Sequence, residues 1–274
     1  MASRQITIAS ATEVLFDHRA ATYDTDDFHP PLAQTLLSTA SPTPGQSILD
    51  LATGTGLVAI AAAKTIGPTG HVTAIDISSK MLAVAKEKAA ALGLTNIVFH
   101  KVDTKDMFTA FPRYSFDHVL CSAGMVFMDD LPTILSDCYN FLKIGGKITF
   151  DAPADGSSLI GSTSANVARQ YGIELPYTRL GTAQKCTDAT SGAGFEDIHV
   201  KTVRFKGTLL KREMLDQAWN RQLMHPLSKK LTDLEPRELK MLKGKFLERL
   251  EAVIPQEGAV DEIVMHIVSG VRLH

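Results

Sequence analysis

Between residues 47 and 151 the chain alternates short apolar runs with longer helical patterns, and this alternation constrains its fold more than any other feature. The apolar runs have strand character, and the stretches between them have helical periodicity and end at glycines. Such an alternation is typical of a parallel sheet with helices on both faces. The expected strands are 47–51, 71–75, 97–102, 116–121 and 147–150, and the expected helices are 57–66, 79–92 and 132–142.

The segments on either side of this core predict more helices and two further strands. The first 40 residues predict one or two helices that end in the Pro- and Gly-rich cluster 41–45. Residues 211–253 are charged and amphipathic, which predicts a helical insertion. The remaining expected elements are a Gly/Ser-rich stretch at 156–164, helices near 166–171 and before 192–194, and strands at 198–205 and 262–271.

Composition excludes several classes of function. The 274 residues carry a formal net charge of -2 and no Lys/Arg-rich block, which argues against a nucleic-acid partner. The three cysteines show no metal-binding or disulfide spacing, so we expect no metal and a reducing, cytoplasmic location. The longest apolar run, 57–63, is too short to cross a membrane, and residues 1–8 lack a signal-peptide core. A small neutral or acidic substrate remains open.

The strongest chemical motif is the loop of residues 50–56, Asp-Leu-Ala-Thr-Gly-Thr-Gly, which follows the first strand and precedes an alanine-rich helix. Glycines in such a turn let the backbone approach a ligand, and the helix N-terminus offers free N–H groups. Asp76 lies at the tip of the second strand, where a carboxylate accepts hydrogen bonds from ribose hydroxyls. Asp103 follows the third strand. These acids meet at the carboxyl edge, where open α/β sheets bind ligands.

Several segments, in this order and spacing, resemble the class I S-adenosylmethionine-dependent methyltransferases, closest in style to the ubiquinone/menaquinone-biosynthesis type. Ala52 stands where many members have the first glycine, and we interpret it as a trait of the subfamily. The lead-in ending at Tyr23 also resembles the family, whose tyrosine commonly closes over the cofactor. The matching stretches are 16–24, 48–56, 74–78, 81–82, 116–119 and 141–146.

The resemblance implies an α/β fold with a Rossmann-like, seven-stranded, mostly parallel sheet, helices on both faces and a helical cap. It divides the chain into a helical lead-in (1–44), a cofactor-binding domain (45–210), the cap (211–255) and the final strand (256–274). It also implies S-adenosylmethionine as cofactor and a small organic acceptor, as in secondary-metabolite or quinone-type biosynthesis. The implied cofactor-binding residues are Tyr23, Asp50, Ala52, Gly54, Gly56, Asp76, Ile77, Met81, Asp103, Thr104 and Ser122.

By the same resemblance, Asp50 and the glycine backbone hold the amino-acid end of the cofactor and Asp76 holds the ribose. Ile77 and Met81 pack on the adenine, and Asp103 receives the adenine amino group. Taken singly, each of these side chains has a plain structural alternative, as a turn carboxylate or as core.

A nicotinamide-dependent dehydrogenase is an alternative. Residues 54–59 match G-x-G-x-x-A, and Tyr139 with Lys143 forms a Y-x-x-x-K pair. Against it, Asp50 would place a negative charge beside a pyrophosphate, and Tyr139 precedes the fifth strand instead of following it. A methyltransferase fold that uses its cofactor for a pericyclic or elimination step is a second alternative. The sequence leaves open whether oxygen, nitrogen or carbon is methylated.

Methyl transfer chiefly requires alignment of the nucleophile and exclusion of water, but a hydroxyl acceptor benefits from a nearby histidine. Of the candidates His18, His29, His225 and His266, the second and third are best placed as catalytic residues. In the cap, an apolar stripe at helical spacing includes Trp219 and Met224, which we expect to bind the substrate. The alternatives for this stripe are ordinary core or the seam of a homodimer.

Overall fold

Seven strands form one sheet in the computed structural model, which describes residues 8–175 and 179–274. Their order is β3-β2-β1-β4-β5-β7-β6, as predicted for a mostly parallel sheet. Strands β1 to β5 run parallel, whereas β7 is antiparallel to both β5 and β6. The strands are β1 Ser47–Leu51, β2 His71–Asp76, β3 Ile97–Lys101, β4 Phe116–Cys121, β5 Leu142–Pro153, β6 Glu196–Leu210 and β7 Ala259–Val271.

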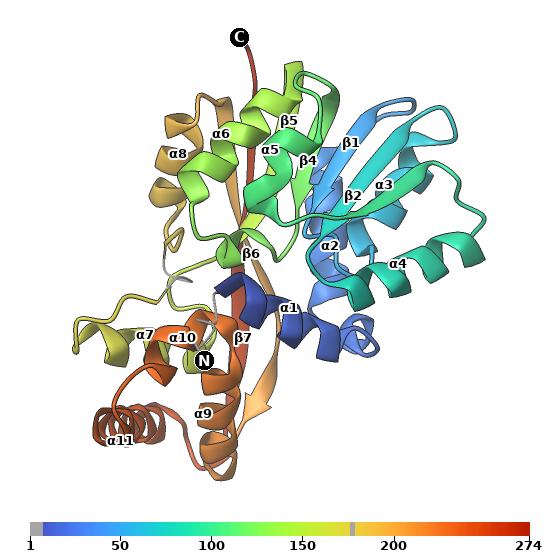
Figure 1. The fold of residues 1–274 in the computed structure, drawn as a ribbon. Coiled ribbons are helices and arrows are strands. Elements are labelled where there is room, and N and C mark those ends of the chain that lie inside the picture. The colour runs from blue at the N-terminus through green and yellow to red at the C-terminus, as the bar shows by residue number, and fades with distance from the viewer. Residues whose placement is uncertain (1–7, 176–178) are drawn as a thin grey trace, which may run out of the picture.

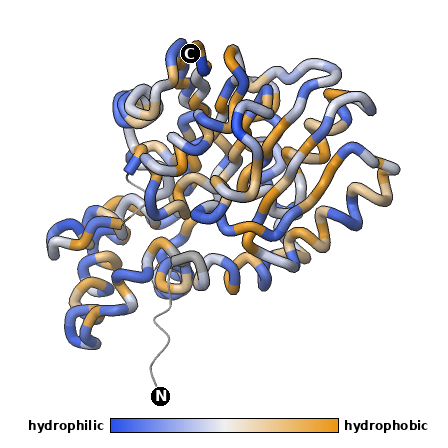
Figure 2. Tube along the Cα trace, turned by 45° about the horizontal axis from the view of Figure 1, so that its top comes forward, coloured by the Kyte–Doolittle hydropathy of each residue, from blue (hydrophilic) through white to orange (hydrophobic). Residues whose placement is uncertain are grey.

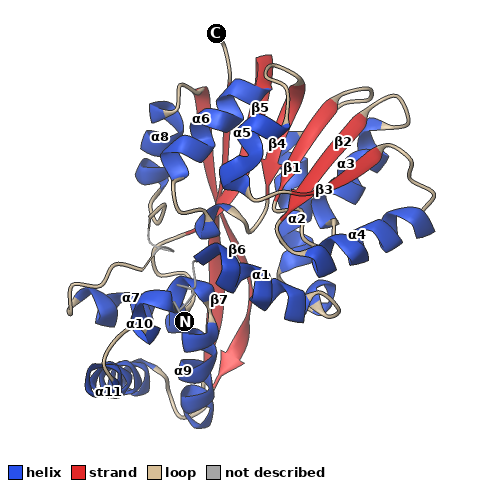
Figure 3. Ribbon diagram, viewed as in Figure 1, coloured by secondary structure: helices blue, strands red, loops and turns tan. Residues whose placement is uncertain are grey.

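Helices cover both faces of the sheet (Figure 3). Alternation along each strand sends neighbouring side chains to opposite faces: Ile48 packs toward α2 and α3, while Leu49 and Leu51 pack with residues of α5, α6 and α8. The helices are α1 Ile8–Arg19, α2 His29–Ala40, α3 Leu57–Ile66, α4 Ser79–Ala91, α5 Met107–Ala110, α6 Leu131–Phe141, α7 Leu159–Arg169, α8 Ala183–Gly192, α9 Leu215–Met224, α10 Lys229–Thr232 and α11 Pro236–Val253.

A second, smaller core lies in the helical cap, which sits at one end of the long strands β6 and β7 (Figure 1). Trp219 of α9 packs against Phe246 of α11, with ring centroids 5.0 Å apart. Val167 and Ala168 of α7 join the same cluster, so the cap includes a helix that precedes β6 in the chain. Helix α1 lies between the sheet and the cap (Figure 1). Figure 2 shows the hydrophobic segments concentrated in the strands of the sheet.

Helix α7 begins earlier than the sequence predicts, because the Gly/Ser-rich stretch is not a loop throughout. Ser158 accepts a hydrogen bond from the Gly161 N–H at 3.2 Å and so caps the helix. The Leu159 N–H is bound by Asp261 of β7. The sequence pattern could not reveal this distant partner, which fixes the start of the helix.

Strands β5, β6 and β7 are longer than predicted. The ladder between β6 and β7 continues to the pair Leu210 and Ala259, where the chain leaves the sheet for the cap and returns from it. The predicted strands 198–205 and 262–271 cover only the part of this hairpin that is farther from the cap. Polar residues such as Thr208 and Asp261 interrupt the apolar pattern beyond that part, although the backbone pairing persists.

Candidate functional site

The loop after β1 folds around a buried acid. Asp50 is 1% exposed, and Thr53 Oγ1 donates a hydrogen bond of 2.6 Å to its Oδ2. Burial raises the pKa of Asp50 to about 7, although the hydrogen bond from Thr53 acts in the opposite direction. A cationic ligand group beside this carboxyl would restore its ionised form.

A second acid, Asp76 at the end of β2, ties the same loop to the neighbouring strand. Its Oδ2 accepts a hydrogen bond from the Gly54 N–H at 2.8 Å, and its Oδ1 accepts one from the Ser78 N–H at 2.8 Å. Burial raises the pKa of this carboxyl, against the effect of these hydrogen bonds. Asp76 therefore shapes the loop and also presents a carboxyl group at the carboxyl edge of the sheet.

Ala52 adopts a backbone conformation that usually requires glycine. Its φ is +51°, in the left-handed region. Its methyl group fits because the facing residue is Gly124: a Cβ there would lie 2.7 Å from the Cβ of Ala52 and 2.7 Å from Cys121 Sγ. The alanine that replaces the usual first glycine is thus matched by a glycine on the opposite side of the site.

Three adjoining hollows open along this edge. The first, of about 700 Å³, extends over the ends of β2 and β3, and the second, of about 330 Å³, lies around Asp50 and the loop. The third, of about 910 Å³, lies between the sheet, α1 and the cap. Tyr23 and Ala123 line all three, so the hollows meet at these two residues.

The third hollow combines apolar walls with a few polar groups. Phe28 and Phe205 meet edge to face at 5.5 Å beneath it, and Phe127 stacks against His225 with ring centroids 5.6 Å apart. Its polar lining is Arg19, His29, Asp151, Ser157, Ser158, Gln222 and His225. Mostly apolar walls with a few convergent polar groups are typical of small-molecule sites.

The two histidines of this hollow differ in their surroundings. His29 Nδ1 lies 2.5 Å from Asp26 Oδ2, and its ring stacks on Tyr23 at a centroid distance of 4.1 Å. His225 forms no ion pair with an acid in residues 8–175 and 179–274, and its Nδ1 accepts the Leu227 N–H at 3.4 Å. Burial lowers the pKa of both, to about 4 for His225, and the charge of Arg19 acts in the same direction.

Asp151 is a further buried acid, at the end of β5. It accepts hydrogen bonds from the Ala123 N–H at 2.9 Å and from Ser122 Oγ at 3.0 Å. Burial raises the pKa of Asp151 to about 7 despite these bonds. It fixes the turn after β4, which carries Ala123 to the junction of the three hollows.

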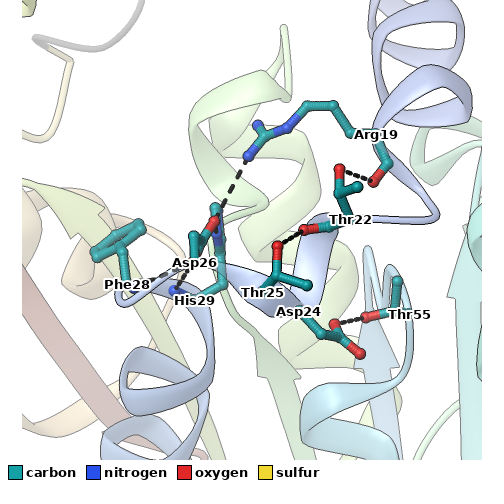
Figure 4. A network of polar contacts seen from close by, with 8 residues as sticks. All are labelled: Arg19, Thr22, Asp24, Thr25, Asp26, Phe28, His29 and Thr55. Carbon is teal, nitrogen blue, oxygen red and sulfur yellow. Dashed lines mark hydrogen bonds and ion pairs between the residues drawn. The ribbon is translucent and has the colours of Figure 1, made fainter.

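The lead-in is attached to the glycine-rich loop through Asp24 (Figure 4). Thr55 donates a hydrogen bond to Asp24, Lys88 Nζ lies 2.5 Å from Asp24 Oδ2, and Lys88 Nζ also donates to the Thr55 carbonyl at 2.9 Å. Tyr23, the preceding residue, is thereby held over the loop: a Cβ on Gly54 would come within 3.9 Å of its ring. The lead-in thus forms a wall of all three hollows.

A family model described as a methyltransferase domain matches residues 42–208, which is more than half of the chain. The chain belongs to this methyltransferase family.

Curated relatives share moderate sequence identity with part of this chain. The nocamycin O-methyltransferase of Saccharothrix syringae is 34% identical over 148 residues, 53% of this methyltransferase and 52% of the relative. The demethylmenaquinone methyltransferase of Listeria monocytogenes is 36% identical over 104 residues, 38% of this chain and 43% of the relative. The matched segment thus spans about half the length of these curated relatives.

Solved structures share the fold. Phosphoethanolamine N-methyltransferase 2 of Haemonchus contortus, solved with phosphomonomethylethanolamine and S-adenosylhomocysteine, aligns with a TM-score of 0.63 at 19% identity over 98% of this chain and 61% of its own. The [4+2]-cyclase SpnF aligns with a TM-score of 0.60 at 16% identity over 98% of both chains. At these identities the likeness establishes the Rossmann-like methyltransferase fold and nothing finer.

The structure brings together ten of the eleven residues implied as cofactor-binding, all of which line the first or second hollow. Gly56 is the exception. It lines neither hollow and begins α3 with a φ of +81°, and a Cβ there would lie 3.1 Å from the Cβ of Ala85. Its conformation allows the turn and the close packing of α3 on α4, and a contact of Gly56 with the cofactor stays a prediction.

The two cap residues predicted to bind the substrate lie away from the third hollow. Trp219 is 3% exposed within the cap core, and Met224 is 70% exposed on the surface. Neither lines the third hollow. Trp219 belongs to the cap core, which was the alternative to substrate binding, because residues of α7 and α11 pack around it, whereas Met224 lies outside that core.

The four candidate histidines and the Y-x-x-x-K pair lie in different parts of the structure. His29 and His225 both line the third hollow, whereas His266 is held by Thr202 and the Gly181 carbonyl, and His18 is exposed. The residues of the dehydrogenase pair lie elsewhere: Tyr139 donates to the His274 carbonyl, and Lys143 pairs with Asp117 at 2.8 Å.

Membrane-spanning helices and metal-binding clusters are both absent from the described ranges, 8–175 and 179–274. No helix in them is both long enough and apolar enough to cross a membrane. No group of three or more His, Cys, Asp or Glu side chains in them could hold a metal ion.

Sequence reasoning missed several residues of the site, chiefly Arg19, Asp26, Phe127 and Asp151. The last could have been found, since it follows a predicted strand as Asp76 does. The others lie in turns and helices where no periodic signal marks them.

Proposed function

We propose that this protein transfers a methyl group from S-adenosylmethionine to a small organic acceptor. The observation that carries the proposal is the meeting of the three hollows at Tyr23 and Ala123. Two of them follow the glycine-rich loop and the acids, as a nucleoside with an amino-acid tail requires. The third is separate, larger and mostly apolar, as an acceptor requires.

The residues present fit this cofactor. Asp50, buried with its pKa raised to about 7, suits an ammonium group, whereas it would repel the pyrophosphate of a dinucleotide. Asp76 suits the ribose hydroxyls, and Ile77 and Met81 form an apolar wall for the adenine. Asp103 and Thr104, which follow β3, also line the first hollow and suit the adenine amino group.

When bound, S-adenosylmethionine supplies a methyl carbon that the acceptor attacks as the bond to sulfur breaks and its electron pair stays on sulfur. The chain's own work is to align the acceptor, exclude water and take up a proton. Tyr23, Phe16 and Phe127 line both the first and the third hollow, which shields the junction from solvent.

We assign the proton-accepting role to His29. It lines both the second and the third hollow, whereas His225 lines only the third. Because His225 Nδ1 accepts the Leu227 N–H, its ring proton lies on Nε2 and the ring presents a donor. His225 would therefore orient a polar group of the acceptor without removing its proton.

We also propose the division into a lead-in (1–44), a cofactor domain (45–210), a cap (211–255) and a last strand (256–274), with α7 packing as part of the cap. The net charge of -2 supports a small-molecule partner and no nucleic acid. Three buried free cysteines support a cytoplasmic location. No homodimer is proposed, because Trp219, at the centre of the stripe offered as a homodimer seam, packs within the cap core.

The test is turnover of methyl-labelled S-adenosylmethionine against a panel of polyketide, quinone and alkaloid acceptors. Transfer of label to an acceptor supports the proposal. A product of unchanged mass formed only in the presence of the cofactor would instead favour the second candidate, a cofactor-assisted rearrangement. That candidate has the support of the shared fold with a cyclase. Calorimetric binding of NAD, without binding of S-adenosylhomocysteine, would refute both.

A further inference from the structure

Asp26 and His29 form a carboxylate–imidazole pair at the edge of the acceptor hollow. Asp26 Oδ2 lies 2.5 Å from His29 Nδ1, and only 13% of the His29 side chain is exposed. The two residues are three apart, on the turn that leads into α2. A carboxylate at this distance accepts the proton of Nδ1 and leaves Nε2 as the free acceptor of the ring.

Asp26 is itself held in place. Its Oδ1 accepts the Phe28 N–H at 3.1 Å and the His29 N–H at 2.8 Å. Arg19 lies 3.8 Å from Oδ2, and Tyr23 covers one face of the imidazole (Figure 4 shows the acid, the arginine and the histidine). Asp26 and Tyr23 therefore hold the ring in place, and His29 lines the second and third hollows.

We propose that Asp26 is a positioning residue, which holds His29 in the tautomer whose Nε2 takes the proton of a hydroxyl group on the acceptor. This inference rests on the proposed function and names its substrate class, an alcohol, phenol or enol methylated on oxygen. A hydroxyl oxygen that gains a methyl group must lose its proton during the transfer, whereas a neutral amine attacks without a base.

The step balances in atoms and charge. The acceptor oxygen gains the methyl carbon as the carbon–sulfur bond breaks, and its hydrogen moves as a proton to Nε2 of His29. The imidazolium is then stabilised by the Asp26 carboxylate, and the proton passes to water after release. No oxidant or reductant takes part.

The charges around His29 agree with this role. Burial lowers the pKa of His29, so the ring is neutral at pH 7, as a base must be. The negative charges of Asp26 and Asp24 raise that pKa, and the positive charge of Arg19 lowers it. Asp151 and His225 also line the third hollow. The pKa of His225 is about 4.

The variant Asp26→Asn separates a positioning role from a structural one. Its amide oxygen still accepts the two backbone N–H groups, so the turn is kept. Its amide NH₂ would face Nδ1 as a donor, which moves the ring proton to Nε2 and removes the base. Asp27→Asn is the matched control, because Asp27 is exposed and its substitution changes the net charge by the same amount.

The experiment is long-range ¹H–¹⁵N NMR of protein labelled at histidine and saturated with S-adenosylhomocysteine, with His29→Gln to assign the signal. We expect the Nδ1–H tautomer in the parent and in Asp27→Asn, and the Nε2–H tautomer with a lower pKa in Asp26→Asn. An Nε2–H tautomer in the parent, or an unchanged tautomer in Asp26→Asn, would overturn the inference.

A kinetic readout keeps the two proposals distinct. With a hydroxyl acceptor from the panel, Asp26→Asn should lower kcat by on the order of 10- to 100-fold, since general-base catalysis contributes about 10²–10⁴. KM and S-adenosylhomocysteine affinity should stay within a few-fold of the parent. Transfer only to amines, or an unchanged kcat, would refute the dyad and leave the methyltransferase intact, whereas no transfer to any acceptor would count against the proposed function itself.

Discussion

Thr55 of the glycine-rich loop donates a hydrogen bond to Asp24 of the lead-in, and Lys88 of α4 pairs with the same carboxylate. This hydrogen bond joins the lead-in, which lines all three hollows, to the loop that would hold the cofactor. A hydrogen bond to a charged group contributes about 1.5–3 kcal/mol. We therefore expect Asp24→Asn to weaken S-adenosylhomocysteine binding by about tenfold, measured by calorimetry, because 1.4 kcal/mol corresponds to tenfold.

The control for this prediction is Lys101→Gln, which removes the ion pair between Lys101 and Glu13 of α1. Exposed pairs of this kind contribute about 0–1 kcal/mol. Its binding constant should stay close to that of the parent. Equal losses in both variants would mean that the lead-in responds to any change of charge and that the Thr55 bond has no special role.

Asp76→Asn should weaken S-adenosylhomocysteine binding by roughly ten- to a hundredfold, on the basis of about 1.5–3 kcal/mol for hydrogen bonds to a charged acceptor. The melting temperature should fall as well, because the carboxylate also accepts the Gly54 and Ser78 N–H groups. Asp106→Asn, at an exposed site, is the control and should change neither quantity.

Binding of S-adenosylhomocysteine should depend on pH through Asp50. Its pKa of about 7 in the free protein means that much of the carboxyl is protonated below neutrality. The ligand's ammonium group favours the ionised form, so affinity should rise with pH through about 7 and level off above it. Calorimetry from pH 5.5 to 8.5 tests this, and Asp50→Asn should bind weakly with a flat profile in the same range.

Trp219→Ala should destabilise the cap by about 3–5 kcal/mol, the usual effect of truncating a buried aromatic residue. S-adenosylhomocysteine affinity should be retained, because the hollows for the cofactor lie in the sheet domain. Met224→Ala, five residues along the same helix and 70% exposed, should change stability by less than about 0.5 kcal/mol. Chemical denaturation of both variants gives the comparison, and similar effects on stability would contradict the placement of Trp219.

The order of elements and the acids at strand ends were predictable from the sequence, because both follow local rules. Strand β1 is an apolar run closed by Asp50 and a glycine turn, and β2 ends at Asp76 in the same way. The start of α7 was not predictable, since Ser158 caps it within a stretch whose composition favours a loop, and Asp261 fixes it from a distant strand.

The substrate side of the site was harder to predict than the cofactor side. Helical periodicity correctly marked the face of α9 that carries Trp219 as apolar, but periodicity does not say what covers a face. His29 was among the predicted catalytic residues, yet its partner Asp26 carries no pattern of its own. Pairs in turns become visible only when the backbone places their side chains together.

The cap leaves the sheet after Leu210 and returns at Ala259, and these two residues face each other across the β6–β7 ladder. Topologically it is an enlarged hairpin loop. The entropic cost of closing such a loop grows only slowly with its length. The length of residues 211–258 can therefore change without changing the register of any strand. Because α7, outside this segment, shares its core, any such change must keep the apolar face that covers Val167 and Ala168.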